Sequence, residues 1–212
     1  MKWVTILIVV WLCSATAEAQ KIIEKHIDYS GKEAVELKIQ IADSINLKTW
    51  KKNEVYIKAS VNINENKDNE AYVTSINETG KTLVVDARIR EKDLKKENNC
   101  CNKTDIYWEI MIPENAVFSV ESIDANVTIT GKTGEMKVKT ISGSIDLSAS
   151  GKREADVDLS TISGRIFSDL ELNPEKSKSS IPVRIHGKMN NGGVQVKLET
   201  ISGDIYLRKS EL

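Results

Sequence analysis

The tetrapeptide Thr-Ile-Ser-Gly occurs three times in the second half of the chain, at residues 140–143, 161–164 and 200–203. Apolar and polar residues alternate on both sides of each copy, as they do in half-buried strands. Counted from the Thr, the apolar residues lie at −4 and −2 before the motif and at +5 after it. A straight strand with one buried face cannot change its phase in this way. The motif therefore predicts a corner that joins two short strands.

Two weaker copies extend the repeat. Ser122-Ile123 and Ser180-Ile181 stand in the place of Thr-Ile, and apolar residues follow each of them at a similar distance. The five copies are about 20 residues apart, and units of this size bury a continuous core when they stack. We therefore expect an all-β fold in which residues 116–212 form a parallel β-solenoid of about five rungs. We expect Gly143, Gly164 and Gly203 to allow unusual backbone angles at the corners.

The first half of the chain also alternates with period two, but without the motif. Four segments show this pattern, and polar, turn-rich stretches separate them. The segments are residues 35–41, 55–63, 83–89 and 106–112. No segment shows a helical period. We expect a β region over residues 20–115 that continues into the solenoid.

The first 19 residues have the form of a signal peptide. Lys2 is followed by an apolar run from Val4 to Leu12, and residues 17–19 have the small-x-small pattern of a cleavage site. A lipoprotein anchor at Cys13 is the alternative, but Leu12 is larger than the residue which that processing prefers. No later segment is apolar enough to span a membrane. The sequence predicts an exported protein that is periplasmic, cell-surface or extracellular.

The charges of the chain nearly cancel, with 30 basic and 31 acidic residues. Nucleic-acid binders carry a basic surface, so this balance argues against a nucleic-acid partner. A cell-surface glycan or an envelope protein fits an exported protein better. The sequence leaves the oligomeric state open.

Cys100 and Cys101 are adjacent, so they cannot form a framework of disulfide bonds. In an oxidising compartment we expect a bond between the two or a bond to another chain. The alternative is an unreactive surface pair. The two histidines, His26 and His186, are too far apart in sequence to complete a zinc site with these cysteines. We expect no metal and no cofactor.

The sequence predicts no catalytic residue. The Ser of the motif repeats, but no histidine or acid repeats beside it, and a serine without a base is not a nucleophile. The carboxylates of Asp124, Asp146 and Asp204 do not recur as the constant pair that glycoside hydrolysis requires. A carbohydrate-active enzyme stays an alternative, because β-helical folds often cleave polysaccharides.

The stretches TISGSIDL, TISGRIF and TISGDIYL, together with IMIPENAVFSVES at residues 110–122, resemble the bacterial putative-adhesin β-strand-repeat family. That family is similar to the head regions of autotransporter adhesins. The resemblance implies a secreted or envelope protein with an adhesin-type binding or structural role, and it transfers no catalytic residue. An envelope-stress accessory protein is a further alternative that relatives suggest.

The phase of the repeat also predicts a surface. If position +5 points into the core, positions +4 and +6 point outward and form two columns across successive rungs. The columns are Arg165, Arg184 and Asp204, and Phe167, His186 and Tyr206. Aromatic rings and guanidinium groups suit a sugar ring or an acidic glycan, so these six residues are the candidate ligand strip. The alternative is a structural seam in which the side chains only stack on each other.

Overall fold

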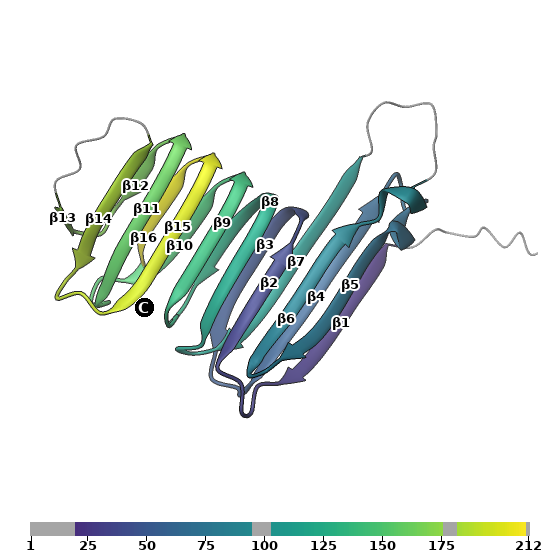
Figure 1. Ribbon diagram of the computed structural model, residues 1–212, viewed down its shortest axis with the longest axis horizontal. Helices are drawn as coiled ribbons and strands as arrows, with labels where there is room; N and C mark the ends of the chain where they lie inside the picture. Colours follow the sequence, from purple (N-terminus) through teal and green to yellow (C-terminus); the bar gives the residue numbers. More distant parts are fainter. Residues whose placement is uncertain (1–19, 95–102, 176–181, 211–212) are drawn as a thin grey trace, which may run out of the picture.

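The computed structural model describes residues 20–94, 103–175 and 182–210, and these residues form sixteen strands in two facing layers (Figure 1). The first layer runs in the order β1 (Lys21–Asp28), β4 (Glu54–Ile63), β7 (Thr104–Pro113), β3 (Ile41–Trp50), β8 (Val117–Thr130), β10 (Ile145–Ser150), β16 (Ile205–Ser210) and β12 (Ile166–Ser168). The second runs in the order β5 (Tyr72–Thr79), β6 (Thr82–Ile89), β2 (Ala34–Ile39), β8, β9 (Met136–Ser142), β15 (Val194–Ser202), β11 (Ala155–Ser163), β14 (Val183–Met189) and β13 (Leu172–Glu175). Short 3-10 turns occupy Asn69–Ala71 and Glu91–Asp93. The all-β prediction is confirmed.

The core lies between the two layers and follows the period-two alternation. In β4 every second side chain, from Val55 to Ile63, is fully buried. The column at position +5 of the motif also behaves as predicted. Ile145 pairs with Ile205, which in turn pairs with Ile166. The first two are fully buried, and Ile166 is half-buried at the end of the stack.

Five rungs, each made of two strands joined by a corner, pair in parallel within the described part of the chain. Strand β8 belongs to both layers because it bends near Ile123, pairing with β9 before the bend and with β10 after it. Strands β9–β10, β11–β12 and β15–β16 bend at the three motifs. The fifth rung is β2–β3, which bends at Gln40. The alternation over residues 35–41 predicts one strand, because the β-bulge between Ile41 and Ser44 hides the change of phase.

The rungs do not stack in the order of the sequence. The last one, β15–β16, lies between β9–β10 and β11–β12, as the yellow strands in Figure 1 show. The threonines of the motif follow the same order. Thr200 Oγ1 donates to Gly143 O at 3.2 Å, and Thr161 Oγ1 donates to Gly203 O at 2.9 Å. Segments that are neighbours in sequence are often, but not always, neighbours in a sheet. Here the rungs pair in parallel but in a different order from the chain, and antiparallel strands at both ends make the sheet mixed.

The rung predicted at Ser180-Ile181 is wrong. The pair itself lies outside the described residues, but β14, which follows it, runs antiparallel to β11. Pro182 and Val183 stand where the motif has Ser and Gly. A proline has no N–H to donate to the next rung, and a valine has a Cβ where the other corners need a glycine. This segment therefore cannot copy the motif corner.

The glycines of the motif are required mainly because the corners pass close to each other, and only one of them has the unusual backbone angle that was predicted. Only Gly143 has a left-handed backbone, with φ +109°. A Cβ on Gly203 would lie 2.1 Å from Gly143 O, and a Cβ on Gly164 would lie 1.9 Å from Gly203 O. Each corner passes so close to the carbonyl of the next rung that no side chain fits between them.

Two predictions fall on residues outside the described ranges, namely the signal peptide at residues 1–19 and the pair Cys100 and Cys101. Across the described residues, the structure contains no helix with the length and apolar character needed to cross a membrane.

Candidate binding surface

The structure brings four of the six predicted strip residues together on the outer face of the first layer. Phe167 on β12 is directly opposite Tyr206 on β16. Their rings stack with centroids 5.2 Å apart and an angle of 9° between the planes. Arg165 and Asp204 lie at the corners that precede these two strands, so the adjacent columns predicted from the motif exist over these two rungs.

A guanidinium group covers each ring. The Cζ atom of Arg165 is 5.1 Å from the Phe167 centroid, and that of Arg208 is 5.0 Å from the Tyr206 centroid. Such contacts between a cation and an aromatic ring are attractive. Arg208 was not among the predicted residues, although the alternation that turns Tyr206 outward also turns the residue two positions later outward. We define the aromatic strip as Arg165, Phe167, Asp204, Tyr206 and Arg208.

Two carboxylates hold the strip in place. Asp204 Oδ1 accepts a hydrogen bond from the Arg165 backbone N–H at 2.8 Å, and Oδ2 accepts one from the Tyr206 hydroxyl at 3.1 Å. The Arg165 amide is the main reason that the pKa of Asp204 lies below its ordinary value. Asp146 accepts from Arg208 Nε at 2.7 Å, which raises the pKa of that guanidinium. The strip therefore keeps its charges near neutral pH.

Arg184 and His186 lie elsewhere. Both are on β14 in the second layer, where they are opposite Ser160 and Asp158 of β11. His186 Nδ1 is 3.4 Å from Asp158 Oδ1. Their place in the strip depended on the rung at Ser180-Ile181, so the antiparallel course of β14 removes both from it.

A second surface follows the corners themselves. The Ile of each parallel corner from β8 onward is exposed, to 45% at Ile123, 43% at Ile141, 41% at Ile201 and 52% at Ile162. We call this row, given in its spatial order, the corner ridge. These isoleucines helped to locate the corners in the sequence, but an exposed row of them was not predicted. Their exposure could have been predicted, because side chains alternate along a strand and the residue directly after a buried Thr points away from the core.

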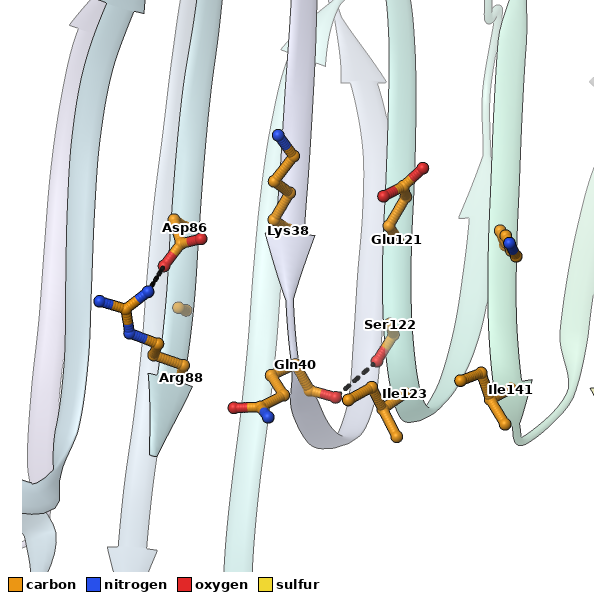
Figure 2. A pocket seen from close by; sticks show the side chains of 10 residues that line it. Lys38, Gln40, Asp86, Arg88, Glu121, Ser122, Ile123 and Ile141 are labelled. Atoms are coloured by element: carbon orange, nitrogen blue, oxygen red, sulfur yellow. Dashed lines mark hydrogen bonds and ion pairs between the residues drawn. The ribbon is translucent and has the colours of Figure 1, made fainter. Parts of the chain in front are cut away.

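A shallow groove of about 390 Å³ lies beside the first two isoleucines of the ridge (Figure 2). Ile123 and Ile141 lie side by side at the bend, and charged side chains of β2, β6 and β8 stand further along the strands. Ser122 Oγ donates to Gln40 O at 3.3 Å and joins two rungs at this point. Lys38 of β2 is paired with Glu121 of β8 in the strand register, so the groove carries both signs of charge.

Within the described ranges, no group of three or more histidine, cysteine, aspartate or glutamate side chains is placed to hold a metal ion.

Comparison with known proteins places the fold. No curated protein matches the chain. A structure from Clostridium sporogenes, described as a putative cell adhesion protein, is 15% identical and has a TM-score of 0.59, covering 91% of this chain and 100% of that one. A putative adhesin from Bacteroides fragilis is 11% identical with a TM-score of 0.28, over 90% of this chain and 98% of that one. Residues 27–208 match the Toastrack DUF4097 family, and the chain belongs to that family.

Proposed function

We propose that this protein is an exported, non-enzymatic binding protein of adhesin type that contacts carbohydrate through the aromatic strip. The observation that supports this proposal most directly is the stacked pair of Phe167 and Tyr206, with a guanidinium group over each ring. Aromatic faces contact the C–H groups of sugar rings, while guanidinium groups donate paired hydrogen bonds to hydroxyls and acids.

The position of the strip favours contact with a large partner. No described strand pairs with β12 on the side away from β16, and Phe167 is 41% exposed. The Phe167 ring and the Arg165 guanidinium over it therefore lie at the end of the first layer. A flat, exposed surface of this kind suits a polymer better than a small molecule, which needs a concave pocket.

Two further observations support export and adhesion. The leader-like residues 1–19 favour export, and the fold is shared with a protein described as a putative cell adhesion protein. The carboxylates nearest the strip, Asp146 and Asp204, already accept hydrogen bonds from Arg208, Arg165 and Tyr206. That arrangement suits the fixing of side chains for binding better than acid–base catalysis.

A glycan array tests the proposal. We expect the purified protein to bind at least one class of glycan through the strip, and the double variant Phe167→Ser, Tyr206→Ser to lose binding to that class. The matched control is Arg184→Ser, His186→Ser, which removes an exposed cation and an exposed ring from β14 in the second layer. Circular dichroism checks that both variants fold. If the strip variant binds as well as the wild type, the strip is a structural seam and the proposal fails.

A further inference from the structure

A second hollow lies at the opposite edge of the rungs, where loops return the chain from the first layer to the second. It measures about 670 Å³. The β8–β9 loop (residues 131–135) and the β10–β11 loop (residues 151–154) form much of its wall. The corners precede the first-layer strands and these loops follow them, so the hollow and the strip share no residue, although Ser210 of the hollow is two residues after Arg208 of the strip.

Arg153 reaches from one of these loops to the other. Its Nη1 donates to Thr133 Oγ1, and its Nη2 donates to Gly134 O at 3.0 Å. Its Nε is buried and has no hydrogen-bond partner. Burial lowers the pKa of this guanidinium, and no carboxylate among the described residues is placed to offset that effect. The Arg153 side chain is half-buried, and its hydrogen bonds to Thr133 and Gly134 go to neutral oxygens, so a nearby anion would stabilise its charge.

Two more cations line the same hollow. Lys132 and Lys152 come from the same two loops as Thr133 and Arg153, and both are exposed. Two carboxylates, Glu114 and Glu154, also line it, and Glu154 accepts a hydrogen bond from Asn191 at 2.9 Å. Of the described residues at the hollow, the cations therefore outnumber the carboxylates by three to two, and the Arg153 guanidinium lies within hydrogen-bond reach of neither acid.

The remaining polar lining suits a sugar. Thr49, Ser150 and Ser210 also line the hollow, and the Thr49 and Ser150 hydroxyls accept hydrogen bonds from the backbone N–H groups of Lys132 and Lys152. Hydroxyls exchange hydrogen bonds readily with the hydroxyls of a glycan, while clustered guanidinium and ammonium groups bind oxyanions. The hollow thus combines an oxyanion site with neutral hydrogen-bonding groups.

We propose that this loop-edge hollow binds the oxyanion group, carboxylate or sulfate, of an acidic polysaccharide. The site is independent of the aromatic strip, so the two can fail separately. Its occupant supplies the counter-charge that Arg153 lacks among the described residues, and the two lysines draw the polymer toward it.

The test uses the purified protein and three soluble polymers in isothermal titration calorimetry: a polyuronate, a sulfated polysaccharide and a neutral polysaccharide. The variant is Lys132→Gln, Lys152→Gln, and both side chains are exposed, so the fold is retained. The control is Lys137→Gln, Lys139→Gln, which removes the same charge from the outer face of the second layer. Arg153→Gln is the third variant, with circular dichroism to verify folding.

We expect the wild type to bind at least one acidic polymer, and the polymer it prefers identifies the group as carboxylate or sulfate. The Lys132→Gln, Lys152→Gln variant should bind that polymer at least tenfold more weakly, as should Arg153→Gln, while the control and the variant Phe167→Ser, Tyr206→Ser should bind it like the wild type. Three outcomes would overturn the proposal: no binding of either acidic polymer, equal affinity in the hollow variant and the wild type, or an equal loss in the control.

Discussion

The two ends of this molecule reach the same layered fold in different ways. Around β4, β5 and β7 the strands are antiparallel, and a large aromatic pair fills the core. Trp108 Nε1 donates to the Tyr72 hydroxyl at 3.0 Å, both residues are fully buried, and burial raises the pKa of Tyr72. In the parallel rungs the close contacts are between backbones, because Gly143, Gly164 and Gly203 let the corners touch. One region depends on side-chain volume, the other on the absence of a side chain.

The largest expected effect is in the antiparallel region. Trp108→Ala should lower the free energy of unfolding by about 3–5 kcal/mol, as other large-to-small core changes do. It also leaves the buried Tyr72 hydroxyl without its donor. Urea denaturation measures the change, and Trp50→Ala, at a half-buried site, should give a smaller one. Equal losses would contradict the role given to the aromatic pair.

In the rungs, Ile205→Ala should cost about 2–5 kcal/mol, because Ile205 is fully buried between Ile145 and Ile166. Ile166→Ala at the end of the stack should cost less. Lys139→Ala on the outer face should change stability by no more than about 0.5 kcal/mol. Thermal unfolding of the three variants gives the order directly, and a different order would refute the assigned stack.

A single added methyl group tests the corners. Gly203→Ala should cost about 1–3 kcal/mol, because its Cβ meets the Gly143 carbonyl and the rungs have to separate. The comparison is Gly31→Ala, where φ is +73° but no atom lies within 4 Å of the new Cβ. That change should cost about 1 kcal/mol through backbone strain alone. If Gly203→Ala proves harmless, the corners do not need close contact.

The corner ridge should respond least to substitution. Ile201→Thr keeps a β-branched side chain at an exposed corner, so we expect a change within about 0.5 kcal/mol by chemical denaturation. A large loss would show that the ridge is part of the core and not a surface.

The last prediction concerns acid. The folded pKa of Asp204 lies below its ordinary value of 3.8, so its ionised form stabilises the folded protein above that pH. The stabilisation is lost only as the pH falls through the lower, folded value. Melting temperatures of the wild type and Asp204→Asn should therefore differ at neutral pH and converge below pH 3.8. A constant difference would show that ionisation of Asp204 does not stabilise the strip.

Much of the fold could be predicted from local patterns. In the first half, period-two alternation located β2, β4, β6 and β7 but not β1, β3 or β5. In the second half, the change of phase at Thr-Ile located three corners and the stack of Ile145 with its neighbours. The order of the rungs could not be predicted. Three copies of one motif present the same threonine and glycine to each other, so nothing in a copy specifies which neighbour it meets. That choice depends on long-range pairing, as between Thr200 and Gly143.

The residues of the candidate surface could be predicted only where the motif is intact. Four predicted residues follow intact motifs by one or three positions and lie together, namely Arg165, Phe167, Asp204 and Tyr206. Arg184 and His186 follow a copy that lacks the glycine, and they lie apart from the strip. The hollow at Arg153 left no local signal, because three loops far apart in sequence build it.

The position of β15–β16 has a consequence for biosynthesis. The ribosome makes this rung after β9–β10 and β11–β12, yet it fills the gap between them. At about 5–20 residues per second, the edges of β9 and β11 wait on the order of seconds for it. Unpaired strand edges are prone to join other chains during such a delay. The junction between the two parts of the stack therefore forms only after β15–β16 has been made, and a chain truncated before Val194 loses it.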